Sequence, residues 1–66
     1  MNSTYVVTVR NLSENTVREV RVEGADPMQV HKQVFMKTSK DEEIQDMLDA
    51  DGNLVFNIKK GFKKAY

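Results

Sequence analysis

Two segments near the amino terminus alternate apolar and polar residues with a period of two, which is typical of half-buried β-strands. They span residues 5–10 and 16–22 and are rich in β-branched side chains. The polar segment 11–15 between them suits a turn, so the pattern predicts a β-hairpin. The register that buries the apolar face pairs Tyr5 with Val22, Val7 with Val20 and Val9 with Arg18.

The segment from Asp26 to Lys37 carries a complete helix start signal. Asp26 can accept hydrogen bonds from the N–H groups of the first turn, and Pro27 suits the first helical position. Gln29 completes a capping box. The apolar positions that follow fall on one stripe and are Val30, Val34 and Phe35. This segment therefore predicts one helix after the hairpin.

Residues 39–58 are compatible with two structures. In the first, Ser39 and Glu42 form a second capping box, which would start a second helix ending near Gly52. The apolar face of that helix would consist of Ile44, Met47 and Leu48. The element order would then be ββααβ.

In the second structure, residues 44–48 and 54–58 form another hairpin around a turn at 49–53, with Gly52 in a left-handed conformation. The register of this hairpin sets Leu48 opposite Leu54, Ile44 opposite Ile58 and Asp46 opposite Phe56. Residues 54–58 alternate cleanly and are expected to form a strand in either structure. Of the two structures we favour the hairpin.

The hairpin interpretation predicts an α+β domain in the order ββαββ, in which a small antiparallel sheet carries one helix on one face. We assign residues 1–60 to this domain and residues 61–66 to a basic carboxyl-terminal tail. The unpaired sheet edges favour a monomer that accepts a partner's strand, or a homodimer through an edge. The residues predicted to face inward are Tyr5, Val7, Val9, Val20, Val22, Val30, Val34, Phe35, Ile44, Leu48, Leu54, Phe56 and Ile58.

A chain of 66 residues without cysteine has neither disulfides nor thiolate metal ligands. It has no apolar run long enough to cross a membrane and no secretory signal pattern, so we expect a soluble, cytoplasmic protein without a membrane partner. The ten basic and ten acidic side chains cancel, but they are unevenly placed. Residues 39–58 carry six acidic and one basic side chain, and residues 59–66 carry four lysines and no acid.

No catalytic constellation is visible in the sequence. Residues 49–52 are similar to a calcium loop, but Met47 and Ile58 occupy its first and last ligand positions. His31 is the only histidine and has no ligand or carboxylate partner at a fixed spacing. A phosphate-binding glycine loop and an activated nucleophile are also absent. We therefore predict a protein that is not an enzyme and that uses no cofactor or metal.

Two charged segments are candidate binding sites. The acidic segment could contact a basic protein surface, and its residues are Asp41, Glu42, Glu43, Asp46, Asp49 and Asp51. The carboxyl-terminal segment could bind nucleic acid through lysines on phosphates and aromatic rings on bases. Its residues are Lys59, Lys60, Phe62, Lys63, Lys64 and Tyr66. A third hypothesis is a structural domain with no ligand of its own.

Residues 20–30, a strand that leads into a capped helix, and the turn and strand of residues 48–56 resemble small accessory proteins of lytic phages. One such ββα-type protein inhibits the bacterial RNA polymerase. The resemblance implies a non-catalytic protein that binds a macromolecule in the cytoplasm of a bacterial host. Our leading hypothesis is accordingly a small binding protein that modulates a protein partner, and nucleic-acid binding through the carboxyl-terminal segment is the alternative.

Overall fold

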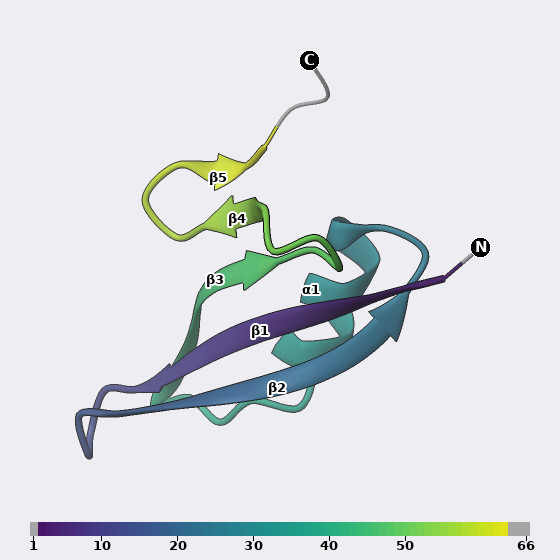
Figure 1. The fold of residues 1–66 in the computed structure, drawn as a ribbon. Helices are drawn as coiled ribbons and strands as arrows, with labels where there is room; N and C mark the ends of the chain where they lie inside the picture. The colour runs from purple at the N-terminus through teal and green to yellow at the C-terminus, as the bar shows by residue number, and fades with distance from the viewer. Residues whose placement is uncertain (1, 64–66) are drawn as a thin grey trace.

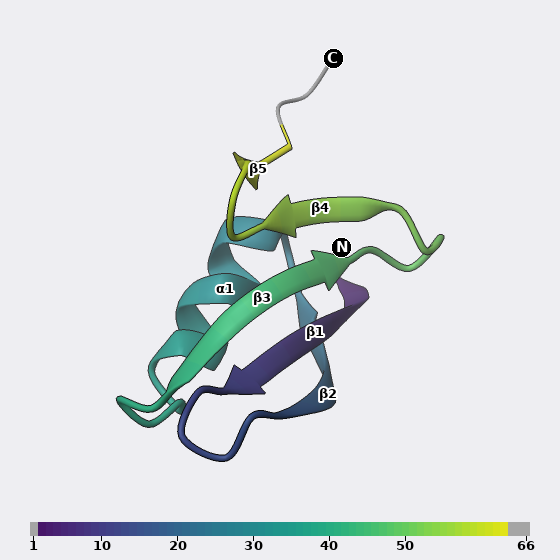
Figure 2. The ribbon, with the colours of Figure 1, turned by 90° about the vertical axis from the view of Figure 1, so that its left-hand side faces the viewer.

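The computed structural model describes residues 2–63 of the chain. One antiparallel sheet of five strands in the order β2-β1-β3-β4-β5 is covered on one face by helix α1 (Figures 1 and 2). The elements are β1 (Ser3–Asn11), β2 (Thr16–Gly24), α1 (Pro27–Phe35), β3 (Glu42–Leu48), β4 (Leu54–Asn57) and β5 (Gly61–Phe62). The predicted α+β class and the ββαββ order of the first five elements are confirmed, and the ββααβ alternative is wrong.

The β1–β2 hairpin has the predicted register, with Tyr5 opposite Val22 and Val7 opposite Val20. Its nine pairs run without interruption from Ser3 opposite Gly24 to the end beside the turn. The regular pairing keeps every second residue of β1 on the helix side of the sheet, which is the reason for its alternating burial.

Helix α1 begins as predicted. The Asp26 carboxylate accepts a hydrogen bond from the Gln29 N–H at 2.9 Å, and Pro27 is the first helical residue. The Gln29 side chain reaches one residue further back than a capping box requires and accepts the Ala25 N–H at 2.7 Å. The helix ends at Phe35, two residues before the predicted end.

The β3–β4 hairpin is present and pairs Leu48 with Leu54 as predicted, but β3 has a bulge against β1 and β4 has a bulge against β3. Against β1, Asp46 pairs with Thr8 and Ile44 pairs with Val9, so Gln45 is an extra residue in β3. Because of this extra residue, Ile44 and Met47 lie three positions apart and both face the helix. Met47 is fully buried, although it was not among the residues predicted to face inward.

The second bulge is in β4. Met47 pairs with Phe56 and Leu48 with Leu54, so Val55 is the extra residue. The predicted pairing of Asp46 with Phe56 is therefore wrong, since Asp46 pairs with Asn57. The pairing of Ile44 with Ile58 is wrong as well, because the Ile58 N–H donates to the Gln45 carbonyl at 2.9 Å.

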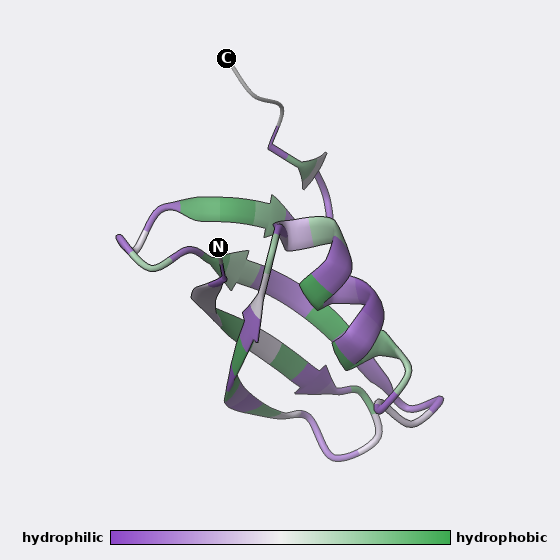
Figure 3. Ribbon diagram, turned by 90° about the vertical axis from the view of Figure 1, so that its right-hand side faces the viewer, coloured by the Kyte–Doolittle hydropathy of each residue, from purple (hydrophilic) through white to green (hydrophobic). Residues whose placement is uncertain are grey.

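The core lies between α1 and the central strands, and Figure 3 shows the outer side of α1 as mostly hydrophilic. Three residues predicted to face inward are exposed instead: Phe35 at 65%, Leu54 at 41% and Ile58 at 44%. Leu48 is half-buried and shares a row with Val6 and Leu54 on the face away from the helix. The buried core residues are Tyr5, Val7, Val9, Val30, Val34, Ile44 and Met47, with Val20, Val22, Val55 and Phe56 packed against them.

The predicted carboxyl-terminal tail begins with structure. Gly61 and Phe62 form β5, which pairs with β4, and the Lys63 N–H donates to the Val55 carbonyl at 2.9 Å. The sheet therefore has one strand more than predicted, and the domain extends beyond the predicted boundary at residue 60.

Candidate functional site

The β2 strand forms one edge of the sheet. In the described residues 2–63, β1 is its only partner strand, and β2 runs for nine residues with no proline and no bulge against β1. Every second residue of such a strand directs its backbone N–H and C=O groups away from the neighbouring strand. Thr16 to Glu19 are exposed, as are Arg21 and Glu23. The β2 edge is therefore accessible to another strand.

A groove of about 360 Å³ lies beside this edge, between β2 and α1. Its apolar residues are Val20 and Val22 from β2 and Val34 from α1. Val20 and Val22 remain half-buried. The polar residues that line the groove are Arg18, Arg21, Glu23, Gln33 and Lys37.

Some charged side chains of β2 form ion pairs within the protein and others do not. Arg18 forms an ion pair with Glu42, with Nη2 at 3.2 Å from Oε2. The hydrogen bond from the Ser39 backbone N–H is the main reason that the pKa of the Glu42 carboxyl lies below its usual value, and Arg18 lowers it further. Among residues 2–63, neither Glu19 nor Arg21 forms an ion pair or a side-chain hydrogen bond. On the face away from the helix, β2 thus presents the alternating charges of Glu19 and Arg21, which no side chain among residues 2–63 neutralises.

The opposite edge is formed by β5, which is only two residues long. Phe62 lies opposite Phe56, and their ring centroids are 4.8 Å apart. The His31 ring packs edge-on against both, at 4.8 Å from Phe56 and 5.4 Å from Phe62. Burial in this cluster lowers the pKa of His31 below 6.5. The aromatic cluster therefore attaches β5 to α1, and His31 acts as a packing residue.

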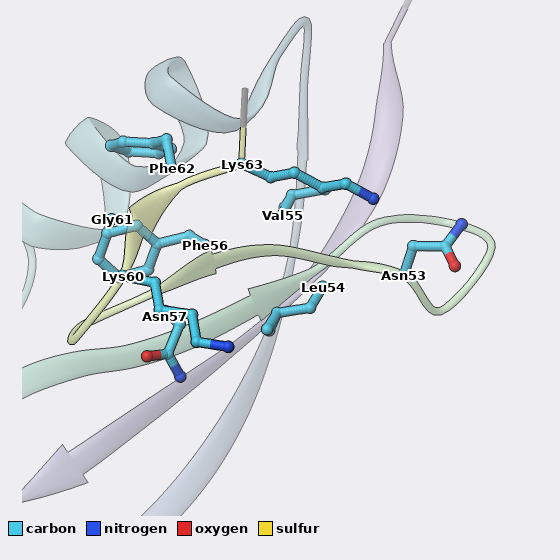
Figure 4. A pocket seen from close by; sticks show the side chains of 9 residues that line it. All are labelled: Asn53, Leu54, Val55, Phe56, Asn57, Lys60, Gly61, Phe62 and Lys63. Carbon is cyan, nitrogen blue, oxygen red and sulfur yellow. The ribbon is translucent and has the colours of Figure 1, made fainter. Parts of the chain in front are cut away.

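A hollow of about 300 Å³ lies around β4 and β5. Figure 4 shows the Lys60 and Asn57 side chains on the same side of the strands, with Lys63 extended along β4 toward Asn53. No carboxylate lines this hollow among the described residues. Its remaining lining residues are Leu54, Val55, Phe56, Gly61 and Phe62.

The structure distributes the predicted acidic contact residues along β3 and its flanking loops. Asp41 precedes β3 and Asp51 follows it, so the whole strand lies between them. The Asp49 carboxylate accepts the N–H groups of Asp51 and Asn53 and thereby shapes the turn. Glu42 is held by Arg18. The remaining two, Glu43 opposite Arg10 and Asp46 opposite Thr8, lie on the face away from the helix.

Three of the predicted nucleic-acid contact residues gather at the β4–β5 hollow, namely Lys60, Phe62 and Lys63. Lys59 lies in the preceding turn, where its N–H donates to the Asn57 side chain at 3.0 Å. Lys64 and Tyr66 lie outside the described residues. The Phe62 ring packs against His31 and Phe56, which limits the area that a base could stack on.

The groove beside β2 was not predicted from the sequence. A partial signal was present, because residues 16–24 contain neither lysine nor proline, two residue types that often protect a sheet edge. Within residues 2–63, no three histidine or acidic side chains group as metal ligands. No helix in that part of the chain is long and apolar enough to span a membrane.

No family model, no curated protein and no solved structure matches this chain.

Proposed function

We propose that this protein is a small non-catalytic binding protein that takes up a β-strand from a protein partner along β2. The observation that carries the proposal is the nine-residue β2 edge, which has no partner strand on its outer side among residues 2–63. Strand addition uses backbone groups for affinity and alternate side chains for specificity. The β2 edge offers both.

Most of the features that usually protect a sheet edge are absent from β2, which supports this proposal. The exception is Arg18, which lies on the helix side and is ion-paired with Glu42. Proteins protect edges with short strands, lysines, prolines, bulges or inward-pointing charges. The β5 edge is short and is bordered by Lys60 and Lys63. In contrast, β2 is long, has neither lysine nor proline, and pairs with β1 without a bulge.

The side chains around β2 define the strand that it would accept. On the helix side, an apolar residue of the partner would lie beside Val20 and Val22 and extend the apolar lining of the groove. On the other side, basic residues would face Glu19 and an acidic residue would face Arg21, because opposite charges directly across a pair are favourable. The expected partner strand therefore alternates apolar residues with charges of both signs.

Nuclear magnetic resonance with a synthetic peptide that alternates valine with lysine and glutamate tests this function at low micromolar protein concentration. We expect amide shift changes along β2 and in the Val34 methyl groups. Val22→Lys should abolish them, because it places a charge in the groove. Val17→Lys is the matched control on the opposite face and should retain them. Shift changes confined to β4 and β5, or equal binding by both variants, would contradict the proposal.

The β4–β5 hollow favours a second candidate function, the binding of single-stranded nucleic acid. It combines two lysines with the half-buried Phe62 and lacks carboxylates among the described residues. Two phosphate contacts should give a slope of log affinity against log salt of about −1.4. Fluorescence anisotropy with short oligonucleotides measures it. Lys60→Ala should bring the slope to about −0.7, whereas Lys40→Ala, in the α1–β3 loop, should leave it unchanged.

A further inference from the structure

We infer that the strand accepted by β2 is the β2 strand of a second copy of this chain, so that the protein forms a two-fold symmetric dimer centred on Val20. The inference rests on the proposed function and names the partner of that site. It goes further because it fixes which residues meet across the interface.

Symmetry leaves few registers for such a dimer. An antiparallel pair of identical strands in one continuous sheet has its two-fold axis perpendicular to the sheet, and directly opposite residues share a face. One residue of β2 must therefore lie directly opposite its own counterpart, with the axis between the two copies of that residue. For extensive overlap of β2 with its copy, the central residue is Glu19, Val20 or Arg21.

The register centred on Val20 pairs all nine residues of β2 with their counterparts. Glu19 then lies opposite Arg21 of the second copy, and the symmetry repeats this pair on the other side of the axis. Val20 lies opposite its own counterpart. The remaining pairs are Arg18 with Val22, Val17 with Glu23 and Thr16 with Gly24, so no like charges are directly opposite.

The two neighbouring registers are unfavourable. Centring the axis on Glu19 places the two Glu19 carboxylates opposite each other. Centring the axis on Arg21 places the two Arg21 side chains opposite each other. It also places Glu19 of each copy opposite Glu23 of the other copy. Both registers also leave part of β2 without a partner. Like charges directly across a strand pair are destabilising, so only the register centred on Val20 combines full overlap with complementary charge.

The surroundings of β2 fit the same dimer. Glu19 and Arg21 have no partner among residues 2–63, and the dimer would supply one for each. The two-fold axis keeps both copies of α1 on the same face of the joined sheet. The grooves that contain Val20, Val22 and Val34 would consequently meet at the axis, where Val20 of one copy would lie against Val20 of the other. The β4–β5 hollows would lie at the two far ends.

Disulfide cross-linking tests the register, because the natural chain contains no cysteine. Opposite residues in an antiparallel pair have Cα atoms about 4.5 to 5.5 Å apart, within the range of a disulfide. Val20→Cys should therefore form a covalent dimer under mild oxidation. Val22→Cys is the matched control on the same face, since its two copies would be about 13 Å apart and should not cross-link. Equal cross-linking of both variants, or none at Val20→Cys, would overturn the register.

Charge exchange tests the pairing of Glu19 with Arg21. Sedimentation equilibrium should show that Glu19→Arg weakens the dimer by about tenfold or more. The double variant Glu19→Arg, Arg21→Glu should restore the affinity to within about threefold, because it recreates both pairs in reverse. Glu14→Arg changes the same charge in the β1–β2 turn and should have little effect. Failure of the double variant to recover would overturn the pairing.

These outcomes are separable from the test of the proposed function. A natural chain that stays monomeric at millimolar concentration and still binds the strand peptide along β2 would overturn the dimer and leave the proposed function intact. Loss of both behaviours would overturn both. Cross-linking at Val20→Cys together with recovery in the charge exchange would support both.

Discussion

The two edges of the sheet differ in length, charge and regularity. The β2 edge has nine residues, pairs regularly with β1 and carries glutamates and arginines in alternation. The β5 edge has two residues, follows a bulged strand and is flanked by Lys60 and Lys63. An edge of the second kind resists the addition of a strand, whereas an edge of the first kind accepts one. The contrast supports placing strand binding at β2 and leaving the other edge for a different ligand.

The same contrast extends into the sheet. On the β2 side, strict alternation keeps Val7 and Val9 of β1 and Val20 and Val22 of β2 on the helix face. On the β4 side, the extra residues Gln45 and Val55 each shift the alternation by one position. The consequence is that Met47 enters the core, whereas Leu48 and Leu54 lie on the open face. Substitutions on the two sides of the sheet can test this difference.

The largest expected effect concerns the bulge in β3. Met47→Ala should lower the free energy of unfolding by about 2 to 5 kcal/mol, because Met47 is fully buried between the sheet and α1. Leu48→Ala is the matched control on the open face and should cost about 1 kcal/mol. Urea denaturation measures both. A regular strand without the bulge would give the reverse order.

The next effect distinguishes two glycines near opposite edges. Gly24→Ala should destabilise the protein by about 1 to 3 kcal/mol, because a β-carbon there would collide with the Val30 side chain at the start of α1. Gly61 has open space around it but a φ of +78°, so Gly61→Ala should cost about 1 to 2 kcal/mol for backbone strain.

Asparagine separates these two causes, since it tolerates a positive φ but is larger than alanine. Gly61→Asn should be more stable than Gly61→Ala, and Gly24→Asn should be less stable than Gly24→Ala. Thermal unfolding of the four variants measures the order. The same order at both positions would contradict the distinction.

A smaller effect concerns the attachment of β5. Phe62→Ala should cost about 1 to 2 kcal/mol, because it removes ring contacts to both Phe56 and His31. The Lys63 N–H should then exchange faster with solvent, since its bond to the Val55 carbonyl depends on β5 staying in place. Met36→Ala is a suitable control because Met36 is mostly exposed and lies outside the aromatic cluster. Unchanged exchange at Lys63 would mean that β5 is held without the aromatic cluster.

The smallest effect is a dependence of stability on pH. Burial lowers the pKa of His31 in the folded state below 6.5, so the unfolded chain binds a proton more readily. The free energy of unfolding should be at its full value above pH 6.5 and should decrease as the pH falls below it. His31 is the only histidine, so His31→Leu should abolish the decrease between about pH 7.5 and 5.5.

The pKa of Glu42 is also lowered from its usual value of 4.5, so its contribution to stability is present above pH 4.5 and is lost at more acidic pH. This second transition lies below the window used for His31. A decrease that persists in His31→Leu above pH 5.5 would contradict the assignment.

The elements with local signals were predictable from the sequence. The β1–β2 register follows from alternation and a short turn, and the start of α1 follows from Asp26, Pro27 and Gln29. The turn before β4 was also predictable, because Gly52 has the positive φ that the turn requires. In each case the decisive interactions join residues that are close in the chain or belong to one regular hairpin.

Contacts between distant parts of the chain determine the bulges, the short β5 strand and the open groove. Neither Gln45 nor Val55 has a sequence feature that marks an extra residue. Their positions depend on how Met47 packs against Val7 and the helix, which involves contacts between distant parts of the chain. The placement of Phe62 likewise depends on rings contributed by α1 and β4. A shift of one residue exchanges the two faces of a strand, so a local pattern could not settle which side chains of β3 and β4 reach the core.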